Sequence, residues 1–228
     1  MRDVTPNRNG RNERLIQELA ADLAPVKRLR RPVWRACLWL GVVVAIAAVL
    51  ALFSDLSAVT QRLTAAPDMW LAAFGSTLTA VLAAVATFQL SIPDRSPMWG
   101  LLPMPAALLW VGASGVGCLR TWIVPEMQDA SLTQSEQCLL FILGLSIPLS
   151  VLLFTMLRRA YTLRPNLAAA IGGLSVAAAS ATLLTFFHPY DTTWTDLIVH
   201  VIAVAIVVIT NWTFAGRLID DKKARLHA

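Results

Sequence analysis

The fold class of this chain is decided by residues Val33–Phe53, which read VWRACLWLGVVVAIAAVLALF. A helix of about 20 apolar residues crosses the hydrocarbon core of a bilayer, and this stretch has one charged side chain, Arg35, near its beginning. Five further stretches have a similar length and character: about Asp68–Leu90, Trp99–Leu119, Glu136–Leu157, Pro165–Phe187 and Trp194–Phe214. The sequence therefore predicts an all-α, polytopic membrane protein with a bundle of six transmembrane helices.

The composition supports this prediction and excludes a soluble globular domain. Of the 228 residues, 57% are hydrophobic and 14% are charged, and the mean hydropathy is +0.62. Charged residues make up about a quarter of an ordinary soluble protein. We expect three parts: a tail of residues 1–32, a transmembrane domain of residues 33–214 and a C-terminal tail of residues 215–228. The polar stretch before the first span is too long for the start of a signal peptide, so this span is expected to be an uncleaved anchor.

The basic residues predict which ends of the spans face the cytoplasm. They gather beside alternate span ends: Arg28, Arg30, Arg31, Arg35, Arg95, Arg158, Arg159, Arg164, Arg217, Lys222, Lys223 and Arg225. The loops at the other ends hold few basic residues, and acidic residues accompany them. By the positive-inside rule, both termini are expected in the cytoplasm. The net charge of +5 is then better suited to anionic lipid headgroups than to nucleic acid.

Small residues recur at every fourth position in two of the predicted spans. The second span has Ala72, Ser76, Ala80 and Ala84, and the fifth has Ala169, Gly173, Ala177 and Ala181. Each set forms one smooth face of a helix, and small faces allow membrane helices to approach closely. These two spans are therefore expected to pack against other helices along these faces.

The tail contains one amphipathic segment, predicted as a short cytoplasmic helix over about residues 13–26. Its apolar stripe and flank supply the predicted partner-binding residues: Leu15, Ile16, Leu19, Asp22, Leu23 and Val26. The leucines and the valine are spaced by four, four and three positions, which is one face of a helix. The helix has two interpretations. It lies on the lipid surface, or it binds a groove on a soluble protein, which its acidic residues favour.

Two groups of reactive side chains are expected at the outer surface. Cys118 ends the third span and Cys138 begins the fourth, and two thiols there form a structural disulfide, sense an oxidant or bind a soft metal. His188 and Asp191 lie in the loop before the last span, and His200 lies inside that span. These three residues are candidate metal ligands, although His188 has a second interpretation as a loop cap. No resident cofactor is expected.

Two other functional classes fit the sequence less well. A small transporter or channel needs polar groups near the middle of the bilayer, and the spans have few besides His200 and some hydroxyls. An intramembrane serine protease is suggested by Gly112-Ala113-Ser114-Gly115 together with His200. However, the second span has no His or Asn for an oxyanion site, and a serine on a glycine-rich face usually serves packing. The chain is therefore not expected to be an enzyme or to have a small-molecule substrate.

The segment Leu15–Leu29, LIQELAADLAPVKRL, resembles the start of NrsF-type proteins, which are membrane anti-sigma factors with six spans. Three further features resemble the same family: Gly75-Ser76, the pair Gly117-Cys118 and Cys138, and residues 187–191, FHPYD. The resemblance covers nearly the whole chain, and the tail and the His-Pro turn are its most specific parts.

The resemblance implies a particular mechanism. The tail would bind an extracytoplasmic-function sigma factor at the bacterial inner membrane and keep it from RNA polymerase. An oxidant or heavy metal at the outer face would act on Cys118 and Cys138. The third and fourth spans would then repack, and the sigma factor would be released. The expected partners are the sigma factor and membrane lipid, without direct contact to nucleic acid.

Overall fold

A computed structural model describes residues 6–21, 30–65, 67–123, 132–158, 160, 162–187 and 194–226. In these parts the chain forms helices joined by turns and short connections, without a strand. The elements are α1 (Pro6–Ala21), α2 (Pro32–Phe53), α3 (Leu56–Ala65), α4 (Pro67–Leu90), η1 (Pro97–Leu101), α5 (Met104–Ile123), α6 (Leu132–Leu157), α7 (Pro165–Leu184) and α8 (Trp194–Leu226). The all-α fold class predicted from the sequence is confirmed.

Six segments within these helices are long and apolar enough to cross a membrane: Pro32–Phe53, Asp68–Leu90, Pro97–Leu119, Glu136–Leu157, Pro165–Leu184 and Leu197–Phe214. They agree with the six predicted spans to within a few residues. The fifth is shorter than predicted, because residues 185–187 form a tighter turn in which each N–H bonds the carbonyl three residues earlier. The last helix, α8, continues well beyond Phe214, to Leu226.

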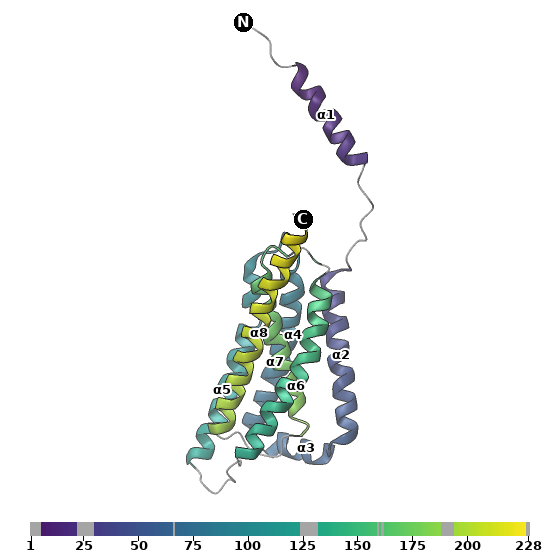
Figure 1. Ribbon diagram of the computed structural model, residues 1–228. Coiled ribbons are helices and arrows are strands. Elements are labelled where there is room, and N and C mark those ends of the chain that lie inside the picture. The colour runs from purple at the N-terminus through teal and green to yellow at the C-terminus, as the bar shows by residue number, and fades with distance from the viewer. Residues whose placement is uncertain are drawn as a thin grey trace.

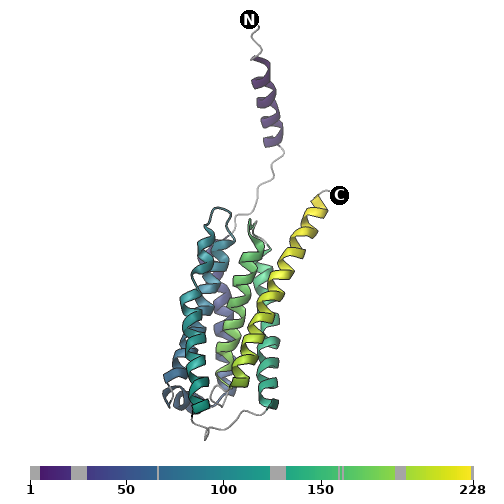
Figure 2. The same ribbon diagram turned by 90° about the vertical axis from the view of Figure 1, so that its left-hand side faces the viewer.

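The helices form one elongated bundle with α7 at its centre (Figures 1 and 2). The most extensive contacts of α7 are with α8 and α4, and it also packs against α6, whereas α5 packs mainly on α4. Most residues of α7 are buried, whereas few of those of α2 are. The predicted small face of α7 is buried along its whole length, at Ala169, Gly173, Ala177 and Ala181.

Two glycines mark places where the backbones of two helices approach each other closely. A Cβ atom added at Gly75 of α4 would lie 2.8 Å from the backbone nitrogen of Trp110 in α5. A Cβ atom at Gly173 of α7 would lie 3.0 Å from the Cα atom of Val208 in α8. Backbone therefore packs on backbone at both contacts, as small residues permit in membrane helices.

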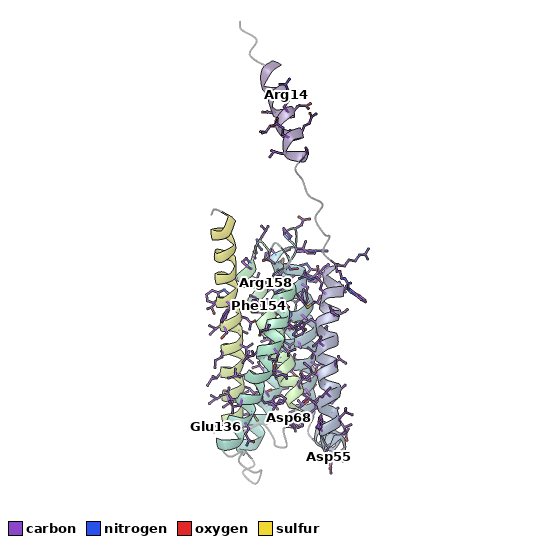
Figure 3. The ribbon with its side chains drawn as sticks, turned by 45° about the vertical axis from the view of Figure 1, so that its right-hand side comes forward. Arg14, Asp55, Asp68, Glu136, Phe154 and Arg158 are labelled. Atoms are coloured by element: carbon purple, nitrogen blue, oxygen red, sulfur yellow. The ribbon has the colours of Figure 1, made fainter. Side chains whose placement is uncertain are left out.

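The two ends of the bundle differ in what they hold. At one end, called here the tail end, α2 begins and α8 finishes, with α1 standing beyond it (Figure 1). At the opposite end, the far end, α5 finishes, α6 begins and α3 lies across the bundle (Figures 1 and 2). The labelled acidic residues Asp55, Asp68 and Glu136 lie at the far end, and Arg158 lies toward the tail end (Figure 3).

The short helix α3 was not predicted from the sequence, where this segment was interpreted as a loop between two spans. Its start is fixed by Asp55, whose carboxylate accepts hydrogen bonds from the backbone N–H groups of Ser57 at 3.0 Å and Ala58 at 3.2 Å. This is a helix N-cap. The aspartate followed by Leu56 and Val59 at helical spacing was the signal available in the sequence.

Candidate functional site

The tail helix α1 presents its apolar stripe away from the rest of the protein. Leu15, Ile16 and Leu19 are 55%, 63% and 63% exposed, and α1 stands apart from the bundle (Figure 1). The helix begins earlier than predicted, at Pro6, where proline is well tolerated because the first N–H groups of a helix have no partner. The other predicted partner-binding residues, Asp22, Leu23 and Val26, lie outside the described residues.

The bundle holds the start of α2, the helix that follows the tail, through a buried arginine. Arg35 is 7% exposed. Its guanidinium donates to the Oγ atom of Ser91 at 3.2 Å and to the backbone carbonyl of Met156. It also lies 4.9 Å from the centre of the Phe88 ring, within the range of a cation–π contact. One side chain therefore joins α2 to the tail-end parts of α4 and α6.

A buried tryptophan extends this anchor one turn further into the bundle. Trp39 is fully buried, and its indole Nε1 donates to the carbonyl of Leu149 in α6 at 3.3 Å. In the described part of α2, the buried residues are Arg35, Ala36 and Trp39. The remainder of α2 is partly buried or exposed, with Leu40, Val43 and Ile46 packed against the core of the bundle. The fully buried contacts of α2 are therefore concentrated in this anchor near the tail. The anchor was missed by the sequence analysis, although a charge inside an apolar span is a recognised signal.

The two predicted sensing cysteines lie near the far end of the bundle, on different helices. Cys118 lies near the end of α5 and Cys138 near the start of α6. Both are thiols in this structure, and both side chains are 6% exposed. Cys138 belongs to an apolar cluster with Ile142, Leu184 and Ala203, so it packs toward α7 and α8. A chemical change at Cys138 would therefore affect the packing of three helices, α6, α7 and α8.

The candidate metal ligands are only partly visible. His188 and Asp191 lie outside the described residues, whereas His200 lies on α8 and is half-buried. Among the side chains that the structure describes, no three His, Cys, Asp or Glu residues are grouped so as to hold a metal ion. The predicted group of His188, Asp191 and His200 stays a prediction.

Residues 19–220 match the protein family described as NrsF, negative regulator of sigma F. This match covers most of the chain, from the last turn of α1 to the last turns of α8. The chain belongs to the NrsF family. The resemblance found in the sequence is thereby confirmed. No curated protein and no solved structure gives a significant match.

Membership of the NrsF family defines the general class of this protein. The family is one of negative regulators of a sigma factor, and so the exposed stripe of α1 belongs to a regulator with a protein partner. The six apolar helices of this member are consistent with a membrane protein. The family description contains no mention of cysteines or metals.

A cavity of about 470 Å³ lies between α4, α5, α7 and α8, with Val59 of α3 at its far end. Most of its lining is apolar, and its polar residues include Ser114 of α5 and His200 of α8. The structure thus brings together the serine and histidine that suggested a protease. However, the hydroxyl of Ser114 makes no hydrogen bond within the described part of the chain, so no Ser–His pair of the kind that activates a serine nucleophile is present there.

Proposed function

We propose that this NrsF-family protein is a membrane-embedded anti-sigma factor that holds an extracytoplasmic-function sigma factor against the cytoplasmic surface of the bacterial inner membrane. The apolar stripe of α1 binds the sigma factor and withholds it from RNA polymerase. The six-helix bundle retains the complex in the lipid bilayer, with both termini in the cytoplasm.

The observation that supports this proposal most directly is the exposure of the α1 stripe. Large apolar side chains on a soluble segment are usually covered, and Leu15, Ile16 and Leu19 have more than half of their surface exposed. Amphipathic helices of this kind lay their apolar face in grooves of partner proteins. The described side chains Glu13 and Glu18 are exposed as well, and acidic groups on a helix disfavour an anionic lipid surface.

The orientation follows from the distribution of charge. The start of α2 with Arg31, the exposed Arg158 and the end of α8 with its basic residues all lie toward the tail end. Basic segments next to apolar spans remain in the cytoplasm. This distribution of charge supports the proposal that the tail end, with α1, faces the cytoplasm, where sigma factors and RNA polymerase are found.

Purification of the tagged, full-length protein from native membranes tests the anti-sigma proposal. A sigma factor is expected in the purified complex, identified by mass spectrometry, in roughly stoichiometric amount. A version that lacks residues 1–21 is the control, since it keeps the complete bundle and should lose the sigma factor. An intact bundle that brings no sigma factor with it would contradict the proposal and would favour the alternative of a small transporter or channel.

We further propose that Cys118 and Cys138 sense the releasing signal at the outer face. An oxidant that accepts two electrons would join the two sulfur atoms in a disulfide as the thiols release two protons. A soft metal ion would instead bind the two thiolates. Because α5 packs mainly on α4 and α6 packs mainly on α7, either reaction would link the far ends of two helices that have different main neighbours. Cys138 would then shift against Leu184 and Ala203 of α7 and α8.

Serine replacements of the two cysteines separate sensing from structure. Cys118→Ser and Cys138→Ser are each expected to keep the sigma factor bound after treatment of cells with diamide or cadmium, measured with a sigma-dependent reporter gene. Each variant removes one of two sulfur atoms that act as a pair. Both variants should therefore lose induction of the reporter gene by diamide or cadmium. Cys37→Ser is the matched control, because Cys37 is exposed on α2 toward the tail end. Opposite effects of the two replacements, or none, would leave the cysteines with a structural role alone.

A further inference from the structure

The cavity described above is a slot that follows α8 from the far end of the bundle toward its middle. Leu197 and Val208 line its two ends, and a helix rise of about 1.5 Å per residue separates them by about 16 Å. Its volume of about 470 Å³ lies within the range of small-molecule binding sites. The slot therefore has room for a ligand that is longer than it is wide.

The polar and apolar parts of the lining lie in different places. Ser114 is the lining residue of α5 nearest the far end, and His200 is one turn from Leu197 on α8. Toward the middle of the bundle, the lining residues include Trp110, Leu174 and Val208. The slot thus combines a polar region near the far end with an apolar region that extends into the middle of the bundle.

The hydroxyl of Ser114 differs from most hydroxyls in the neighbouring spans. Ser76, Thr79 and Thr182 each donate to a backbone carbonyl of their own helix, at 3.0, 2.7 and 2.9 Å. In the part of the chain that the structure describes, the Ser114 hydroxyl has no such bond. A hydroxyl without a partner is unfavourable in an apolar environment. Its position in the cavity wall therefore leaves a hydrogen-bonding group available to whatever fills the slot.

We propose that the slot binds a single-chain amphiphile, a hydrocarbon tail with one oxygen-containing head group. The head group hydrogen-bonds to the Ser114 hydroxyl beside the imidazole of His200, and the tail lies along Trp110, Leu174 and Val208 toward the middle of the bundle. This orientation matches the way an amphiphile sits in a bilayer, with its polar head toward the surface. The binding of this ligand does not depend on the proposed anti-sigma function.

Photolabelling of the full-length protein in lipid nanodiscs tests the proposal. The two probes are a diazirine-bearing dodecanol and a diazirine-bearing dodecane of the same length, which differ in the hydroxyl group alone. The alcohol is expected to label residues 104–114 and 197–208, mapped by peptide mass spectrometry, about fivefold more than the alkane, the ratio that one hydrogen bond provides. Equal labelling by both probes would overturn the proposal and identify the slot as a place for lipid acyl chains.

Two variants make the test specific. Ser114→Ala should reduce labelling by the alcohol to the level of the alkane, without loss of the fold, because this hydroxyl bonds nothing in the described structure. Thr210→Val is the matched control, since Thr210 is exposed on α8 outside the slot and its replacement should change nothing. The proposal is wrong if the alcohol probe labels Ser114→Ala as strongly as the wild type. It is also wrong if exposed side chains of α2, such as Leu52 and Phe53, are labelled as strongly as the slot.

Discussion

Replacement of Leu19 by aspartate is expected to abolish binding of the sigma factor while leaving the membrane bundle intact. Leu19 lies within the exposed stripe of α1 and is 63% exposed, and α1 stands apart from the bundle (Figure 1), so its replacement leaves the packing of the bundle unchanged. In a complex, burial of a leucine contributes about 2 kcal/mol, and an unpaired carboxylate in an apolar groove costs more. A combined loss of at least about 3 kcal/mol corresponds to more than about a hundredfold increase in Kd.

The measurement is the Kd of the purified sigma factor for the protein in nanodiscs, determined by fluorescence anisotropy. Gln17→Asp is the matched control. It adds the same charge to an exposed position of the same helix, but position 17 lies two residues from Leu19 and so on another face of the helix. A Kd for Leu19→Asp close to that of Gln17→Asp would show that the stripe is not the binding surface. The helix would then be assigned to the lipid surface.

The six spans were predictable because their signal is local. Length and apolar composition alone determine whether a helix can cross a bilayer, and each span satisfied this criterion by itself. The small face of the fifth span was equally local, and Gly173 and Ala177 are buried as expected. The tail stripe was visible for the same reason, since Leu15 and Leu19 are one turn apart in sequence. A family resemblance of the tail then supplied the partner class, which periodicity alone left open.

The contacts that position the tail were not predictable in this way. Arg35 meets Ser91 and Met156, which are 56 and 121 residues away in sequence. The first apolar span gives no sign of which helices will surround its arginine. The meeting of Ser114 and His200 at one cavity also depends on how α5 and α8 pack around α4 and α7. Such arrangements come from the tertiary fold, in which residues far apart in sequence become neighbours.

These contacts also provide a physical route from the far end to the tail. Cys138 packs against α7 and α8, and α6 carries both Cys138 near its start and Met156 near its end. The carbonyl of Met156 accepts a hydrogen bond from Arg35, which anchors the start of α2. A rigid-body movement of α6 would therefore act on the helix that follows the tail. Under the proposed sensing mechanism, the oxidant or metal would release the sigma factor only to the extent that its reaction or binding favours one arrangement of the bundle over the other.

Replacement of Gly173 by leucine is expected to prevent formation of the folded bundle. The added Cβ atom alone would lie 3.0 Å from the Cα atom of Val208, 3.1 Å from the Cβ atom of Asn211 and 3.2 Å from the carbonyl oxygen of Val207. Two of these are backbone atoms of α8, which cannot move without the whole helix. Overpacking of a well-packed interior costs about 1–3 kcal/mol and occasionally more. Because this leucine would lie between two helix backbones, we expect a cost at the upper end of that range.

The consequences extend beyond the contact itself, because α7 and α8 form the most extensive helix pair of the bundle. If α8 is pushed away, Asn211 loses its hydrogen bond to the Oγ atom of Ser150 in α6, which is 3.1 Å long. Asn211 is 3% exposed, and a buried amide that lacks its partner costs a further 1–3 kcal/mol or so. The helices α6, α7 and α8 should therefore separate together, which would leave the far-end cluster around Cys138 without its neighbours.

Two measurements test this prediction. The first is the free energy of unfolding in mixed micelles that contain sodium dodecyl sulfate, and the second is the monodisperse fraction of the protein in size-exclusion chromatography. Gly41→Leu is the matched control. The same substitution at Gly41, in the apolar part of α2, has no atom within 4 Å of the added Cβ, and leucine favours a helix over glycine by nearly 1 kcal/mol. Gly41→Leu should therefore be as stable as the wild type or slightly more stable. If Gly173→Leu were to unfold at the same detergent concentration as Gly41→Leu, the packing of α7 directly on the backbone of α8 would be contradicted.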